Sequence, residues 1–130
     1  CQAGILCAAV ADYTPENVAE NKIKRQGDLC INLKPTKDIA QALGQQKRPD
    51  QVLAGFALET QDEASNAKGK LQKKNLDFIV LNSLNDEGAG FRHDTNKITL
   101  ITCQNEKQFP LKSKKEVAKD IVNQLAEIIK

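Results

Sequence analysis

The stretch QVLAGFALETQDEASNAKGKLQKKNLDFIVLN, residues 51–82, predicts the centre of the fold. Residues 51–58 and 76–82 are largely apolar runs with the length of strands buried in a sheet. Between them, residues 60–74 carry acids in the first turn and lysines in the last turn of a predicted helix, as the helix dipole favours. One face of this helix carries the small or apolar residues Ala64, Ala67 and Leu71. Two strands joined by a helix are typical of an α/β fold.

Another apolar run lies near the start of the chain. Residues 3–11, AGILCAAVA, predict a strand buried on both faces, in which Cys7 would behave as a small, reduced hydrophobic residue. Asp12 would stand at the carboxyl end of this strand. The polar residues that follow, together with the alternating LCINL segment at 29–33, predict an extended arm or hairpin over about residues 13–34.

The segments after the arm predict a helix and a hairpin. Pro35 and Thr36 favour the start of a helix that runs to about Gln46. Its short apolar stripe consists of Ile39, Ala40 and Leu43. Two glycines indicate a loop over residues 83–94, and the segments KITLITC and KQFPLK after it predict an antiparallel hairpin.

The C-terminal segment predicts a helix over residues 113–130. Ser113 and Glu116 have the spacing of a capping box at its start. Apolar residues then recur at helical intervals at Val117, Ile121, Leu125 and Ile128. The predicted elements together indicate an α/β domain: a Rossmann-like three-layer sandwich with a mainly parallel sheet, an antiparallel hairpin near the C-terminus and a protruding arm.

Length and composition narrow the class of protein. The 130 residues, 40% of them hydrophobic and 28% charged, suit one globular domain. A net charge of +2, four Phe and one Tyr argue against nucleic-acid binding, and no apolar run has the roughly twenty residues of a membrane span. The four cysteines show no CxxC spacing, which favours a reducing compartment, the cytoplasm, and argues against zinc. The chain opens at Cys1 without an initiator Met, so we expect a piece of a longer protein.

Polar residues that follow the predicted strands are the first candidates for a functional site. In α/β folds, ligands bind beyond the carboxyl ends of the strands. The polar residues at these ends are Asp12, Glu59, Thr60, Asn82 and Ser83. The single histidine, His93, lies in the predicted loop without a serine or cysteine partner, which argues against a catalytic role.

Several motifs resemble, in the same order, those of one enzyme family. They are AAVADY at 8–13, KIKR at 22–25, KDI at 37–39, GFALET at 55–60, KLQKKNLDFIVLN at 70–82, NKITLI at 96–101 and SKKEVA at 113–118. The family is the phosphopantothenate–cysteine ligase (phosphopantothenoylcysteine synthetase) domain of the bacterial bifunctional coenzyme A biosynthesis protein. The chain departs from it at PTKDIA, where NPDI is commoner, and at Arg25, where lysine is frequent.

The resemblance implies a CTP-dependent ligation. With Mg²⁺, CTP converts the carboxylate of 4'-phosphopantothenate into an acyl-cytidylate and releases pyrophosphate. The amine of cysteine then displaces CMP. The resemblance covers the C-terminal portion of the synthetase domain, so the N-terminal portion and the FMN-dependent decarboxylase domain would lie outside this chain. It implies a homodimer, and we expect this portion alone to be inactive.

The resemblance also implies a role for individual residues. Asp12 would hold Mg²⁺ and reach the triphosphate. Lys22, on a mobile flap, would be the catalytic lysine and would also bind the nucleotide. Ala8 and Ala9 would meet the nucleotide base with their backbone groups. The remaining nucleotide-binding positions are Asp38, Ile39, Phe56, Lys70 and Lys74.

Other interpretations of the same residues stay open. Asp12 alone would more often start a turn, and Lys70 and Lys74 could simply complement the end of a helix. A nucleotide-binding module without catalysis is one alternative. An NAD(P)-dependent Rossmann oxidoreductase is another, although no GxGxxG motif follows a predicted strand. The residues themselves do not distinguish CTP from ATP.

Overall fold

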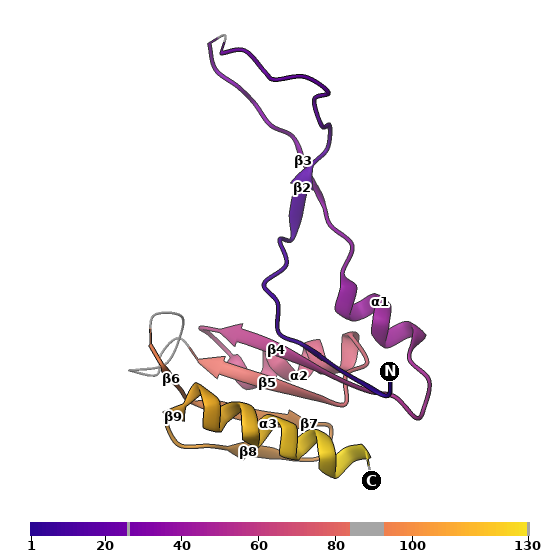
Figure 1. Ribbon diagram of the computed structural model, residues 1–130, viewed down its shortest axis with the longest axis vertical. Helices are drawn as coiled ribbons and strands as arrows, with labels where there is room; N and C mark the ends of the chain where they lie inside the picture. Colours follow the sequence, from indigo (N-terminus) through magenta and orange to yellow (C-terminus); the bar gives the residue numbers. More distant parts are fainter. Residues whose placement is uncertain (26, 84–92, 130) are drawn as a thin grey trace.

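The computed structural model describes residues 1–25, 27–83 and 93–129. Its central sheet has the strand order β1-β4-β5-β7-β8 (Figure 1). These strands are β1 (Ala3–Leu6), β4 (Val52–Glu59), β5 (Phe78–Ser83), β7 (Ile98–Thr102) and β8 (Glu106–Gln108). The first three are parallel, whereas β7 and β8 pair antiparallel. This arrangement confirms the predicted α/β class and the antiparallel hairpin.

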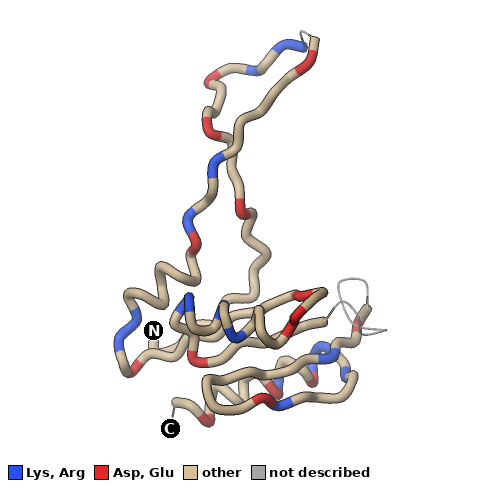
Figure 2. The backbone as a smooth tube through the Cα atoms, turned by 180° about the vertical axis from the view of Figure 1, so that it is seen from behind, with Lys and Arg blue, Asp and Glu red and all other residues tan. Residues whose placement is uncertain are grey.

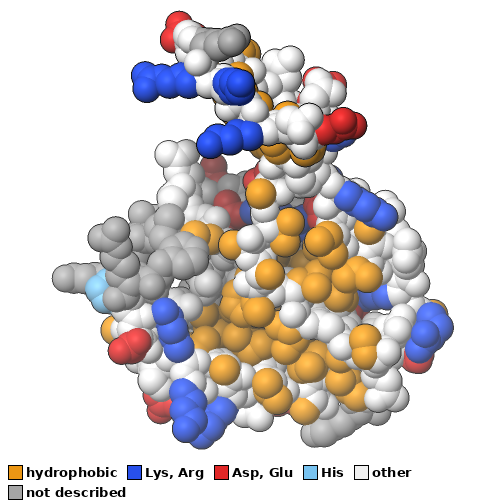
Figure 3. Space-filling model, turned by 45° about the horizontal axis from the view of Figure 1, so that its top comes forward, with side chains coloured by type: hydrophobic (Ala, Val, Ile, Leu, Met, Phe, Trp, Pro, Cys, Tyr) orange, Lys and Arg blue, Asp and Glu red, His pale blue; other side chains and the backbone are white. Residues whose placement is uncertain are grey.

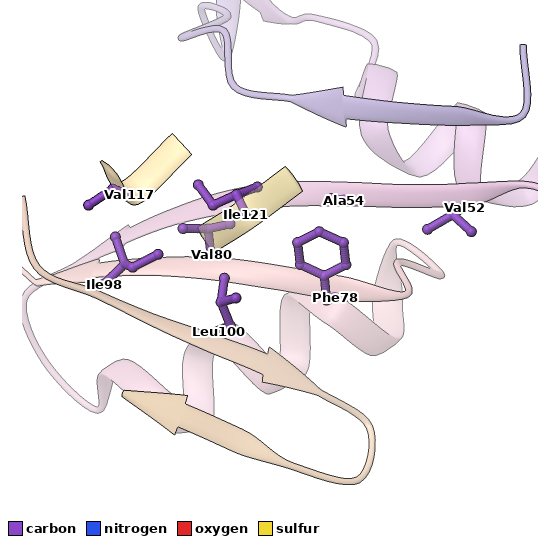
Figure 4. Close-up of a cluster of buried hydrophobic side chains, with 8 residues drawn as sticks. All are labelled: Val52, Ala54, Phe78, Val80, Ile98, Leu100, Val117 and Ile121. Carbon is purple, nitrogen blue, oxygen red and sulfur yellow. The ribbon is translucent and has the colours of Figure 1, made fainter. Parts of the chain in front are cut away.

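Helices cover both faces of the sheet, which gives the three predicted layers (Figure 1). Helix α2 (Glu63–Lys73) packs on one face through Ala67 and Leu71, as the sequence predicts. Helix α3 (Lys114–Ile129) packs on the other face (Figure 4). The buried cluster on that face consists of Val52, Ala54, Phe78, Val80, Ile98, Leu100, Val117 and Ile121.

The start of α3 confirms the capping box. The Ser113 backbone N–H and hydroxyl donate to Glu116 Oε2 at 3.1 and 2.6 Å, and the Glu116 backbone N–H donates to Ser113 Oγ at 3.3 Å. These bonds lower the pKa of the Glu116 carboxyl from its ordinary value. Ser113 also belongs to the short strand β9 (Lys112–Ser113), which pairs with β6 (Thr95–Asn96).

The predicted N-terminal strand is shorter and less buried than expected. β1 ends at Leu6 and its four residues are half-buried, because it is an edge strand paired only with β4 in the described sheet. Residues 7–12 leave the sheet and are exposed. Cys7 is therefore not a buried strand residue, and Asp12 does not directly follow a strand. The prediction of a long buried strand was wrong because the side chains of this segment are apolar but small, and such side chains do not require burial.

The predicted arm is present and projects away from the body (Figure 1). Two short strands, β2 (Tyr13–Pro15) and β3 (Leu33–Pro35), pair antiparallel near its base. The alternating LCINL segment forms strand only at Leu33, and Cys30 is exposed rather than packed. Figure 2 shows basic and acidic residues along the arm.

Helix α1 (Ile39–Gln46) begins later than predicted. Asp38 is its N-cap and accepts a 2.9 Å hydrogen bond from the Gln41 backbone N–H. Pro35 ends strand β3 instead of opening the helix. The predicted apolar stripe of α1 is only partly buried, because Ile39 and Leu43 are 48% and 42% exposed.

The predicted loop at 83–94 is described only at its ends. Ser83 is the last residue of β5, and residues 84–92 lie outside the described part of the chain. His93 and Asp94 are exposed and belong to no strand. No helix in the described ranges has the length and apolar character needed to cross a membrane.

Candidate functional site

The cavity that gathers the predicted residues lies where the arm joins the body. Its volume of about 720 Å³ falls in the range of small-molecule sites. One wall comes from residues that lead from β1 into the arm, and the opposite wall from residues that lead from β3 into α1. The sheet contributes Gly55, Phe56 and Ile79, and the end of α2 contributes Lys70 and Lys74. Figure 3 shows apolar side chains gathered on the body below the arm.

The cavity brings together most of the predicted site residues. Its lining includes Ala8, Asp12, Asp38, Ile39, Phe56, Lys70 and Lys74. Ala9 lies in the same exposed segment but does not line the cavity. Lys22 is exposed on the arm and is not among the lining residues. Residues 20–25 and 27–30 of the arm lie at the end far from the body (Figure 1).

The Asp12 carboxylate has no protein partner among the described residues. Asp12 makes no side-chain hydrogen bond or ion pair within the described ranges, whereas its backbone carbonyl accepts a 2.9 Å hydrogen bond from the Thr36 N–H. The described residues contain no group of three His, Cys, Asp or Glu side chains that could hold a metal. Mg²⁺ needs no such group, because one or two carboxylates plus substrate phosphates and waters are sufficient. An unpaired carboxylate and two lysines that line the same cavity therefore fit a magnesium-bound phosphate ligand.

Lys70 and Lys74 each pair with an acid. Lys70 Nζ lies 2.6 Å from Glu59 Oε1, and Lys74 Nζ lies 3.2 Å from Asp38 Oδ2. Glu59 is the last residue of β4, and its other carboxylate oxygen lies 3.4 Å from Asn66 Nδ2. The spacing of Lys70 and Lys74 along the end of α2 directs both lysines to one cavity, as predicted. An anion that binds there has to compete with these two carboxylates.

Asp38 is ionised in this arrangement. The hydrogen bond from the Gln41 backbone N–H is the main cause that lowers the pKa of the Asp38 carboxyl from its ordinary value. Partial burial opposes this shift, and the Lys74 ammonium reinforces it. Asp38 thus joins the N-terminus of α1 to the end of α2 at the cavity wall.

The other polar residues at the strand ends do not line the cavity. Glu59 and Ser83 are partners in the β4–β5 register, but Ser83 Oγ donates to Glu63 Oε1 at 2.6 Å. Asn82 accepts from Asn96 Nδ2 at 3.1 Å. The strand-end candidates other than Asp12 therefore lie outside this cavity. Those of β4 and β5 bond mainly to neighbouring elements.

Sequence reasoning missed other residues of the cavity wall, among them Thr36. Its hydroxyl donates to the Ala11 carbonyl oxygen at 2.6 Å and its N–H to the Asp12 carbonyl oxygen at 2.9 Å. We had expected it to open a helix. The pairing of Tyr13 with Pro35 in the arm places Asp12 and Thr36 opposite each other at the next position. A hairpin register drawn from the sequence could have found this contact.

Comparisons with known proteins agree with the motifs. The family model described as DNA/pantothenate metabolism flavoprotein C-terminal domain matches residues 1–129. The chain is 44% identical over 128 residues to the Coenzyme A biosynthesis bifunctional protein CoaBC of Bacillus subtilis (strain 168), covering 97% of the chain and 31% of that protein. It is 54% identical over 131 residues to a cysteine/cysteine sulfinic acid decarboxylase of an unknown prokaryotic organism, covering 99% of the chain and 36% of that protein.

A solved structure supports the same relationship. The crystal structure of the C-terminal domain of CoaBC superposes with a TM-score of 0.72 at 36% identity, over 94% of this chain and 52% of that one. The chain thus spans about a third of these curated relatives and about half of the solved domain. The resemblance predicted from the motifs is confirmed: the chain belongs to the DNA/pantothenate metabolism flavoprotein C-terminal domain family.

Proposed function

We propose that this chain is the nucleotide-binding, C-terminal portion of a phosphopantothenate–cysteine ligase in coenzyme A biosynthesis. The reaction would join 4'-phosphopantothenate to cysteine through an acyl-cytidylate, with CTP as co-substrate and CMP and pyrophosphate as products. The observation that carries this proposal is the cavity itself. In a member of this family, it combines the lone carboxylate of Asp12 with the ammonium groups of Lys70 and Lys74.

The cavity residues would bind and orient the triphosphate. Its negative charge must be offset before the anionic carboxylate of phosphopantothenate can approach the α-phosphate. Lys70 and Lys74 would exchange their carboxylate partners for phosphate oxygens. Asp12 would hold Mg²⁺, which when bound would neutralise phosphate charge and fix the triphosphate geometry. Ala8 and Ala9 would leave room for the base because their side chains are small.

Lys22 would take part in the chemical step. Its ammonium group would stabilise the negative charge that develops as the acyl-cytidylate forms. The proposal requires the arm to move or to meet another chain, since Lys22 does not line the cavity of its own chain. Within the described residues, the only strand pairing in the arm is the short β2–β3 ladder at its base, which suits a segment that changes position.

The arm is also the proposed dimer contact. Its large apolar side chains are more than half exposed: Tyr13, Val18, Ile23, Leu29, Ile31 and Leu33. Apolar side chains gathered on one extended segment are typical of a surface that a partner covers. We therefore propose a homodimer through the arm. The four unpaired cysteines support the cytoplasm as the proposed compartment.

Two other functions remain as alternatives. A non-catalytic module would bind CTP but form no product, even when the chain is completed with the part of the CoaBC domain outside the aligned region. A dinucleotide oxidoreductase would bind NAD(P) rather than CTP. The decarboxylase name of one relative belongs to a protein of which the aligned part is 36%, so it does not assign that reaction to this portion.

Calorimetric titration of the chain with CTP, with and without Mg²⁺, tests the proposal. We expect Mg²⁺-dependent binding that the Asp12→Asn variant weakens by about tenfold or more, because a charged ligand group is lost. Asp50→Asn is the matched control, since Asp50 is 3.0 Å from Arg48 and lies outside the cavity. Equal affinity of Asp12→Asn and the parent chain would show that the metal role is wrong. Binding of NAD in place of CTP would favour the oxidoreductase.

A further inference from the structure

At the base of the arm, next to the β2–β3 ladder, one residue makes two hydrogen bonds between the two sides. Thr36 donates both its hydroxyl and its backbone N–H across the arm, to the carbonyl oxygens of Ala11 and Asp12. Beyond it lie the β2–β3 pairs, and farther out the Glu16 N–H donates to the Asn32 carbonyl at 2.9 Å. Thr36 is therefore the last cross-link before the chain separates towards β1 and towards α1.

The same residue connects the acidic and basic sides of the cavity. Asp12, which follows Ala11, presents the unpaired carboxylate. Two residues after Thr36, Asp38 caps α1 and pairs with Lys74. Hydrogen bonds therefore join Thr36 to Ala11 and Asp12, the chain itself joins Thr36 to Asp38 through one residue, and Asp38 pairs with Lys74.

We propose that Thr36 is a positioning residue: its hydroxyl fixes the backbone at Ala11 and Asp12, and thereby sets the position of the Asp12 carboxylate relative to Lys74. The consequence for a bound nucleotide rests on the proposed function, whereas the structural link does not. Thr36 is half-buried at the cavity wall, and its hydroxyl bond to Ala11 lies at the solvent-exposed side of that wall. Nothing in this role requires contact between Thr36 and the ligand.

The substitution Thr36→Val isolates the hydroxyl. Valine keeps the β-branched shape and the backbone N–H that donates to Asp12, and it removes only the bond to Ala11. Thr36→Ser restores a hydroxyl and should restore the behaviour of the parent chain. Thr14→Val is the matched control, because Thr14 lies in the same arm base opposite Lys34, does not line the cavity and makes no side-chain hydrogen bond in the described ranges.

Amide hydrogen exchange on the ligand-free chain measures directly whether the Thr36 hydroxyl stabilises the backbone at Ala11 and Asp12. In Thr36→Val we expect the peptides covering residues 8–16 and 33–40 to exchange about fivefold faster, the factor expected for one lost hydrogen bond. Peptides from β4, β5 and α3 should be unchanged, and Thr36→Ser and Thr14→Val should behave like the parent. Unchanged exchange at the arm base in Thr36→Val would overturn the proposal, whatever the chain binds.

Titration with CTP then reads the effect on the cavity. With Mg²⁺, Thr36→Val should lower the affinity by about fivefold, and without Mg²⁺ the variant and the parent should bind alike, since the lysines keep their places. Equal loss with and without Mg²⁺ would overturn the positioning of Asp12. A parent chain that binds no CTP would overturn the proposed function, while the exchange result would still decide whether Thr36 holds the arm base.

Discussion

The body and the arm of this chain differ in the burial of their apolar residues. Every buried hydrophobic residue of the described core lies between Val52 and Ile121, in the sheet, in α2 and α3 and in the turn before β5. The large apolar residues of the arm are exposed, with Val18 at 85% and Leu29 at 63%. The body therefore supplies the folding free energy, and the arm adds little to it. The cavity lies at the junction of body and arm, between the stable residues of the sheet and α2 and the weakly held residues that lead into the arm.

A core substitution should reveal the largest difference between the two regions. Phe78 is fully buried in β5, so Phe78→Ala should lower the free energy of unfolding by about 3–5 kcal/mol. Leu29→Ala in the arm should change it by less than about 0.5 kcal/mol. Urea unfolding followed by circular dichroism measures both. A similar loss in the two variants would mean that the arm is part of the cooperative core.

A smaller effect is expected where α1 meets α2 beside the cavity. A Cβ at Gly44 would overlap the carbonyl oxygen of Lys74, so Gly44→Ala should cost about 1–3 kcal/mol. The matched control is Gly69→Ala in α2, where a Cβ meets nothing within 4 Å and should stabilise by about 0.5–1 kcal/mol. Thermal unfolding measures both. Equal changes in the two variants would contradict the close packing of α1 on the end of α2.

The smallest expected effect concerns the charge of Asp38. Its pKa is lower in the folded chain than in the unfolded chain, so its ionised form stabilises the fold above the unfolded-state pKa of 3.8. Asp38→Asn keeps an N-cap side chain but removes the charge, at a cost below about 1 kcal/mol because the pair is partly exposed. The difference from the parent should be present at pH 7 and vanish as the pH falls below 3.8. A difference that persists in acid would contradict the ionic contribution of Asp38.

The body could be predicted from sequence because its signals agree with one another. The runs at 51–58 and 76–82 need two layers to cover them, and the helix between them has a small, apolar face for that purpose. The capping box at Ser113 and the helical spacing of apolar residues after it also predict the C-terminal helix from local sequence alone. Apolar pattern and local capping point to the same elements there, so the fold class was predictable.

The arm and the cavity depend on contacts that a local pattern does not contain. Residues 7–11 are as apolar as a buried strand, but their short side chains bury little area and the chain leaves the sheet after Leu6. Thr36 resembled a helix start because its partners, Ala11 and Asp12, lie about 25 residues away. Lys70 and Lys74 were identified through the family resemblance, whereas their ion pairs with Glu59 and Asp38 appeared only in the structure.

The central claim is that the cavity at the body binds CTP whereas the arm supplies the catalytic lysine, and Lys22→Gln tests this claim most directly. The variant is made in this chain joined to the part of the CoaBC domain that lies outside the aligned region, and both CTP affinity and amide formation are measured. We predict CTP affinity equal to that of the parent, because Lys22 does not line the cavity, together with loss of phosphopantothenoylcysteine formation. Normal turnover by Lys22→Gln would contradict the claim that the arm supplies the catalytic lysine.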